Sequence, residues 1–340
     1  MNLFKAELRR LARRRLSLVF GILAVAGVVG LTAIMWATSS QGPDEGQLAE
    51  AQAQADQWNE DNPDYGDCLE DEGFFEENAN YAWAVEDSAY ADMSHEERCE
   101  FYVGGMTAED FIYTYTFSFE NEGSYMLIGV AIVAGLIMMM LASSAIGAEW
   151  SSGGMSNLMV WHPHRMKVWG AKLGAALAVC AAAVAGVVVL AFGLLYLTAA
   201  VRGEVGDLDG VWWEATLERL GRTGLLTLGM TALGASLAML GRHTAIAGGV
   251  IAGYLIIGDM LVQITSMSLP VDYPERFSLY TWVMAWISGK IELYNWNSSG
   301  MEMTPDVMVI TATDAGLLLG GIVVLFGALA TWAFQRRDAA

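Results

Sequence analysis

Long apolar stretches separated by polar segments dominate the pattern of this 340-residue sequence. A helix needs about 20 apolar residues to cross the roughly 30 Å hydrocarbon core of a bilayer. Six stretches reach this length, at residues 16–38, 123–148, 173–201, 223–241, 244–269 and 315–334. Because no water can satisfy open backbone groups inside a bilayer, the pattern predicts an all-α integral membrane protein with six transmembrane helices.

The distribution of basic residues predicts the orientation of these helices, since cytoplasmic loops are enriched in Lys and Arg. With the N-terminus in the cytoplasm, the inner segments hold 12 of the 18 basic residues. Their acidic residues are then only Glu7, Glu149 and Asp338. Six crossings return the tail at 335–340 to the same side. We therefore expect a multi-pass protein of the plasma membrane with both termini cytoplasmic.

Residues 39–122 form a polar insertion between the first two predicted spans, on the outer side. This segment has 23 acidic residues and only Arg98 as a basic one, so its net charge is −22. Its 14 aromatic residues argue against a disordered acidic tail. Residues 46–59 favour a helix, and Ser94 with Glu97 has capping-box spacing. We predict a small, mainly helical extracellular domain.

Two of the three cysteines, Cys68 and Cys99, lie in this outer segment, where disulfides persist. We expect them to pair, with two free thiols as the alternative. Cys180 falls inside a predicted span and is interpreted as a packing residue.

Two further segments have amphipathic or aromatic character without the length to cross. Residues 1–15 place Phe4, Leu8 and Leu11 on one helical stripe, which predicts an interfacial helix beside anionic membrane lipid. Residues 270–306 are rich in aromatic side chains, including Trp282 and Trp286. They predict an outer interfacial helix or re-entrant hairpin that caps a pathway, or else an aromatic belt without a gating role.

One acidic residue, Asp259, lies well inside a predicted span. A carboxylate at membrane depth is costly and indicates a pathway or cargo contact. The alternative is a hydrogen bond to a neighbouring helix.

Catalytic and cofactor motifs are missing from the sequence. No Gly-Lys-Ser/Thr phosphate loop occurs, no Cys/His set has metal-ligand spacing, and no Gly-x-Ser-x-Gly elbow is present. We expect no catalytic residue, no metal and no cofactor in this chain. A net charge of −20 also argues against nucleic acid as a partner.

The segment at 149–166, between the second and third predicted spans, carries the most specific pattern. An acidic residue ends the span, a glycine follows four residues later, and an apolar stretch leads to a proline and basic residues. This pattern resembles the permease subunits of type-2 ABC exporters, in which Thr-Leu stands where Gly154 and Met155 occur here. The matching residues are Glu149, Gly153, Leu158, Met159, Pro163 and Arg165.

The resemblance implies a transport subunit rather than an enzyme. Two permeases, identical or related, would pair, and each would bind a cytoplasmic ATPase that supplies ATP and Mg. The segment would be a cytoplasmic coupling loop, with coupling residues Glu149, Trp150, Gly153, Leu158, Pro163 and Arg165. The span region 167–334 would then line the pathway, with Asp259, Trp282 and Trp286 as pathway or gate candidates.

Two other classes of function remain open at this stage. One is a membrane-anchored sensor or cell-envelope scaffold whose acidic outer domain binds a partner. The other, an intramembrane enzyme, is disfavoured because no catalytic groups pair.

Overall fold

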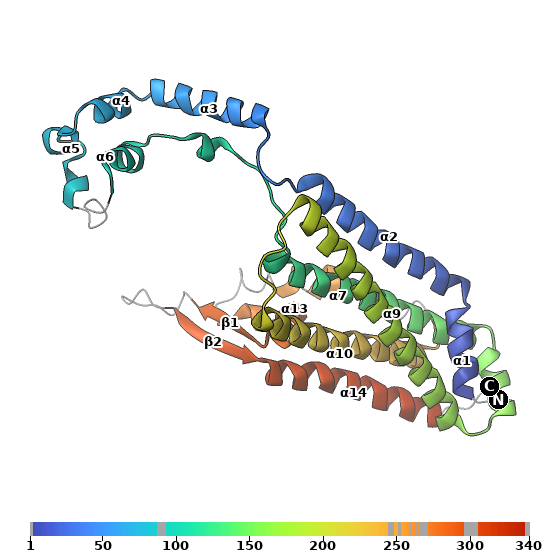
Figure 1. The fold of residues 1–340 in the computed structure, drawn as a ribbon. Helices are drawn as coiled ribbons and strands as arrows, with labels where there is room; N and C mark the ends of the chain where they lie inside the picture. The colour runs from blue at the N-terminus through green and yellow to red at the C-terminus, as the bar shows by residue number, and fades with distance from the viewer. Residues whose placement is uncertain are drawn as a thin grey trace. The chain divides into compact units, whose positions relative to one another are not determined.

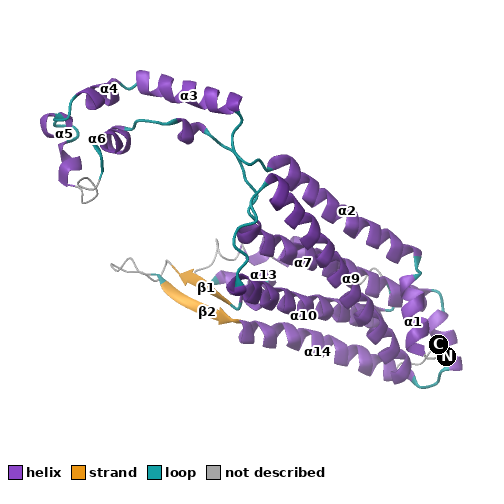
Figure 2. Cartoon of the chain, in the orientation of Figure 1, coloured by secondary structure: helices purple, strands orange, loops and turns teal. Residues whose placement is uncertain are grey.

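The structure is a computed structural model of the chain. It describes residues 3–86, 93–243, 248–250, 253–258, 260–262, 264, 271–295 and 305–336. Helices predominate (Figure 2). The chain divides into two compact units, which we call the helical unit (Met1–Met35, Ser118–Ala200 and Val205–Ala340) and the acidic unit (Trp36–Phe117 and Val201–Glu204).

Five helices among the described residues are long and apolar enough to cross a membrane. They are α2 (Arg15–Thr38), α7 (Ser124–Ser151), α9 (Arg165–Arg202), α10 (Gly210–Gly241) and α14 (Ala312–Arg336). Half of the predicted span at 244–269, including Asp259, lies outside the described residues, and the described pieces include the π-helical turn η6 (Tyr254–Gly258). The chain is therefore a mainly helical, multi-pass membrane protein.

Helices α9 and α10 are longer than the apolar stretches predicted at 173–201 and 223–241. Helix α9 begins eight residues earlier, at Arg165, and α10 begins at Gly210, where the Asp209 side chain accepts a hydrogen bond from the Trp212 amide. The sequence pattern missed these ends because hydropathy reports only the apolar part of a helix, whereas capping groups fix where it starts.

Helices α7 and α10 approach closely at two glycines, and Figure 1 shows α10 lying beside both α7 and α14. A Cβ atom added at Gly135 would lie 2.5 Å from the Thr227 side chain, and one at Gly234 would lie 2.6 Å from the Met139 carbonyl oxygen. A larger residue at either position would push the two helices apart, so their separation depends on these glycines.

The segment before α14 forms a helix followed by a two-stranded sheet. The 3-10 turn η7 (Pro274–Phe277) precedes α13 (Leu279–Ser288), and β1 (Lys290–Asn295) pairs antiparallel with β2 (Asp306–Thr311). The sequence reading predicted helix or hairpin at 270–306 and missed this sheet. Lys-Ile-Glu-Leu in β1 alternates with the period of two that is typical of a strand, whereas Val-Met-Val-Ile in β2 is a short apolar run without alternation.

The acidic unit consists of short helices and turns. Its elements are α3 (Glu45–Glu60), α4 (Pro63–Glu70), α5 (Phe74–Glu77), η1 (Ala82–Glu86), α6 (His95–Arg98), η3 (Cys99–Val103) and η4 (Ala108–Phe111). The predicted capping box is present at α6, where Ser94 and Glu97 exchange hydrogen bonds. The hydrogen bonds from Ser94 to the Glu97 carboxylate lower the pKa of Glu97 below its usual range, because they favour the ionised form.

A small aromatic core and a disulfide hold these short helices together. The sulfurs of Cys68 and Cys99 are bonded, and both cysteines are fully buried among Phe74, Phe75 and Tyr102. Helices of four to eight residues are unstable alone, so their order depends on this core and on the cross-link.

We expect Cys68→Ser to destabilise the acidic unit by about 3–4 kcal/mol, because the disulfide closes a long loop in the unfolded chain. Thiol counting under denaturing conditions without reductant should find one reactive cysteine in the wild type, Cys180, and two in Cys68→Ser. A Cys180→Ala variant, which keeps the cross-link, is the matched control and should show none. Three reactive thiols in the wild type would contradict the pairing.

Candidate functional site

The segment predicted as a coupling loop folds into a short helix between α7 and α9. Helix α8 covers Gly154–Trp161. Gly153 precedes it with a φ of +72°, a left-handed conformation that glycine adopts without strain, and this residue turns the chain out of α7. Pro163 lies in the following turn, and α9 then begins at Arg165. Two long helices are thereby joined through one short, separately folded helix.

One face of α8 is packed against the helical unit. Met155 is fully buried, and Leu158 and Met159 are partly buried in the same apolar cluster. Spacings of three and four residues place these side chains on one side of a helix. The cluster also contains residues of α1 (Leu3–Ala12), α7, α9, α10 and α14, so α8 contacts the point where five helices meet.

The opposite face of α8 is exposed. Asn157, Val160 and Trp161 have the same three- and four-residue spacing and all face outwards. Val160 is 79% exposed and Trp161 is 77% exposed. Val160 and Trp161 are thus two adjacent large apolar side chains exposed on a helix whose other face is packed. Such a pair is typical of a surface that a partner covers.

Glu149 does not belong to this exposed face. Its carboxylate is buried at the end of α7, where Oε1 lies 2.6 Å from Arg10 Nη2 and Oε2 lies 2.6 Å from Lys172 Nζ. Lys172 Nζ also donates a hydrogen bond of 2.8 Å to Glu7 Oε1. These four residues form what we call the ion-pair cluster, and it joins α1 to α7 and α9.

Burial distinguishes the ion-pair cluster from an ordinary ion pair on the surface. The side chains of Lys172, Glu149 and Glu7 are only 3%, 8% and 11% exposed, whereas Arg10 is half exposed. A charge in such surroundings is tolerated only beside its counter-charges. Helix α1 is therefore fixed to the helical unit by charge, as well as by Leu11, which is buried in the apolar cluster rather than lying wholly on lipid.

Trp150 and Arg165 attach the ends of this segment to other helices. The Trp150 indole N–H points at the Met239 sulfur at 3.3 Å, and the Arg242 guanidinium lies over its ring at 4.6 Å. Arg165 Nη1 donates to the carbonyl oxygens of Phe334 and Gln335 at the end of α14. Both side chains have structural contacts within the helical unit.

The pathway candidates Trp282 and Trp286 lie in a different part of the helical unit. Both pack against the small core of α13, β1, β2 and the start of α14. Their indole N–H groups donate to the carbonyl oxygens of Arg276 at 2.7 Å and Arg222 at 2.8 Å. The structure brings neither of them to α8, and Asp259 is outside the described residues.

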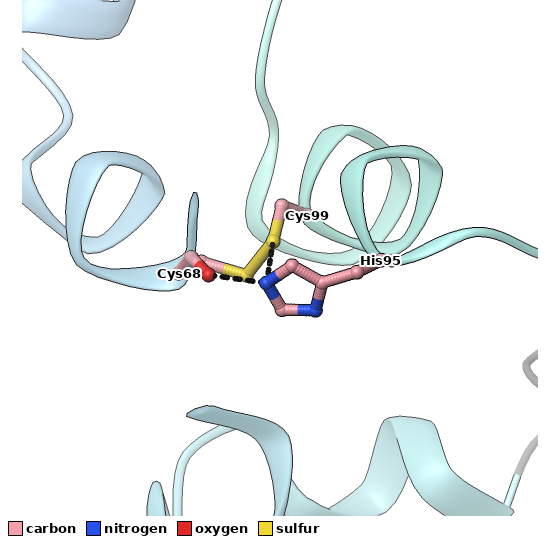
Figure 3. Close-up of side chains that lie close together, drawn as sticks. All are labelled: Cys68, His95 and Cys99. Carbon is pink, nitrogen blue, oxygen red and sulfur yellow. Dashed lines mark hydrogen bonds between the residues drawn. A yellow bond between two sulfur atoms is a disulfide. The ribbon is translucent and has the colours of Figure 1, made fainter. Parts of the chain in front are cut away.

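A second group of chemically interesting side chains lies in the acidic unit. Figure 3 shows His95 beside the disulfide, with Nε2 2.7 Å from the Cys68 carbonyl oxygen and 3.6 Å from Cys99 Sγ. The sequence spacing did not indicate this grouping, which the fold creates. A metal here would require both sulfurs as free thiolates, whereas in this structure they are bonded to each other. We interpret the group as a disulfide with a neighbouring histidine.

The five long apolar helices among the described residues define the class as a multi-pass membrane protein, and a comparison with known protein families gives its family. The family described as ABC-2 family transporter protein matches residues 1–339. The chain belongs to this family of ABC transporter permeases. No curated protein and no solved structure matches it significantly.

The sequence motif identified Glu149 but not its partners. From the sequence, Glu7, Arg10 and Lys172 are charges of the inner segments, and Arg10 belongs to the basic face of the interfacial helix; nothing there pairs them with Glu149. One signal was available in the sequence. Lys172 directly precedes the apolar stretch at 173–201, and a lysine at the edge of a membrane span needs a counter-charge. The exposed pair Val160 and Trp161 was also missed, because the motif concerns the other residues of the loop.

We expect Glu149→Gln to lower the stability of the helical unit by about 3 kcal/mol or more, because it removes one partner from a buried ion pair. Thermal or denaturant unfolding of the purified protein measures this loss. Adding Lys172→Gln should cost less than the sum of the two single effects, since the pair is coupled. The control is Glu218→Gln, which removes an exposed pair with Arg222 and should change stability by about 0.5 kcal/mol at most. Equal losses in both variants would contradict the proposed anchoring.

Proposed function

We propose that this chain is the membrane-spanning permease of an ATP-driven exporter and that α8 is the surface on which a separate cytoplasmic ATPase docks. The observation that carries this proposal is the two-sided character of α8. Met155, Leu158 and Met159 bind it to the helical unit, while Val160 and Trp161 are left exposed. A helix of this kind can transmit a displacement from a bound partner to the helices behind it.

The geometry supports a mechanical link rather than a chemical one. Helix α8 is connected directly to α7 and α9 and packs against residues of α1, α10 and α14. A push on its exposed face therefore reaches several spans at once, because packed interiors pass on displacements instead of absorbing them. In this proposal the ATPase supplies ATP, Mg and hydrolysis, and two permease chains, identical or related, form the pathway between them.

The proposed topology has six spans with both termini and α8 in the cytoplasm. The sixth span is the predicted one at 244–269. This arrangement places the acidic unit outside the cell, where a Cys68–Cys99 disulfide persists. It also places Arg13, Arg14 and Arg15 at the inner surface, where positive charge is favoured.

We expect Trp161→Ser to weaken binding of the ATPase by roughly thirtyfold or more, because an exposed tryptophan at the centre of an interface is typically worth about 2 kcal/mol or more. The measurement is the ATP hydrolysis that copurifies with the tagged permease. The control is Tyr113→Ser, which removes a 90% exposed aromatic residue of the acidic unit and should change nothing. If Trp161→Ser copurified with the same hydrolysis as the control, α8 would not be the docking surface, and a sensor or scaffold built on the acidic unit would become the better reading.

Single cysteines test the proposed orientation. In a Cys180→Ala background, which keeps the Cys68–Cys99 disulfide, a membrane-impermeant maleimide should label Tyr113→Cys in intact cells. It should label Val160→Cys only after the cells are opened, because α8 lies on the cytoplasmic side. Labelling of position 160 in intact cells would overturn both the topology and the docking proposal.

A further inference from the structure

A pocket of about 260 Å³ opens where α1 meets α7 and α9. Its charged lining consists of Glu7, Arg10, Arg14, Glu149 and Lys172, and its remaining walls are mostly alanine, leucine and isoleucine side chains. The volume far exceeds the roughly 10–15 Å³ that admits one water molecule. The pocket is thus large enough for a polar ligand with apolar substituents.

The charges around this pocket do not balance. Three of the lining residues are basic and two are acidic. Arg10 and Lys172 already pair with the two carboxylates, since Arg10 contacts Glu149 and Lys172 contacts both Glu149 and Glu7. The positive charge that remains is that of Arg14.

Arg14 has hydrogen-bonding capacity to spare. Its Nη2 donates to the Ser144 carbonyl oxygen at 3.2 Å. Its Nη1 is buried, and no hydrogen-bond partner for it occurs in the part of the chain that the structure describes. A buried guanidinium N–H without a partner costs free energy, and an anion placed against it would recover that cost.

We propose that this pocket binds the phosphate of an anionic membrane lipid, with Arg14 Nη1 donating to a phosphate oxygen. A phosphodiester carries one negative charge, which neutralises the single uncompensated positive charge of the lining. Arginine is well suited to such a ligand because its fork of N–H donors matches phosphate oxygens.

The position of Arg14 favours a lipid over free phosphate. Arg14 immediately precedes α2, the first helix long enough to cross the membrane, and so lies at the depth of the lipid headgroups. The apolar walls contributed by α7 and α9 suit the glycerol and upper acyl groups that accompany a lipid phosphate. Free phosphate has no apolar group that could contact these walls. The inference is independent of the docking of an ATPase on α8.

The test compares neighbouring arginines in the full-length chain. Wild type, Arg14→Gln and Arg13→Gln are reconstituted in phosphatidylcholine nanodiscs with a small fraction of phosphatidylglycerol, and lipid retained after extraction is counted by native mass spectrometry. Arg13 is exposed and adjacent, so the two variants lose the same charge. We expect Arg14→Gln to retain phosphatidylglycerol roughly tenfold less well, and Arg13→Gln to resemble the wild type.

Two further measurements, thermal unfolding and competition with inorganic phosphate, complete the test. Thermal unfolding in pure phosphatidylcholine should be the same for wild type and Arg14→Gln, and phosphatidylglycerol should raise the midpoint of the wild type and Arg13→Gln only. Millimolar inorganic phosphate should not displace the lipid. Equal retention by the two variants, or destabilisation of Arg14→Gln already in phosphatidylcholine, would overturn the site. Displacement by inorganic phosphate would overturn the assignment to lipid. No ATPase is present, so failure here leaves the docking proposal untouched.

Discussion

The arrangement of α1, α7 and α9 depends on the need to neutralise Lys172. This lysine is 3% exposed and lies at the edge of an apolar stretch, where an unpaired ammonium would be very costly. Glu149 and Glu7 come to it from two different helices, and Arg10 shares Glu149. Apolar packing alone would allow α1 to slide along the bundle, whereas the charged contacts define one position for it.

The ion-pair cluster bears on the role of Glu149, the acidic residue of the family pattern. A carboxylate at the start of a cytoplasmic loop invites the interpretation that it touches the partner. In the structure it points into the protein, and the residues available for contact are Val160 and Trp161 on the far face of α8. Through its ion pairs, Glu149 joins α1 and α9 to α7, and α8 packs against these helices.

Much of the fold could be predicted from the sequence, because length and hydropathy are sufficient to locate spanning helices. The contacts of individual residues could not be predicted from length and hydropathy. The pairs Gly170/Gly174, Gly249/Gly253 and Gly316/Gly320 have the spacing for close helix approach, yet only Gly316 is crowded, where an added Cβ would lie 2.6 Å from the Trp286 ring. The close approach of α7 to α10 uses Gly135 and Gly234, which belong to none of these three pairs. Spacing along one helix does not reveal which face meets a neighbour, so the glycines and the partners of Glu149 required the structure.

The acidic unit and the helical unit accommodate their charged side chains in opposite ways. The segment at 39–122 carries a net charge of −22, and its acidic side chains lie mostly in water, so their mutual repulsion opposes compaction. A disulfide and a few aromatic rings offset this repulsion. The helical unit has few charges and places several of them inside, where each must be compensated. The remaining positive charge of Arg14 is the point at which that compensation is incomplete within the described chain, and an anion from the surrounding membrane would complete it.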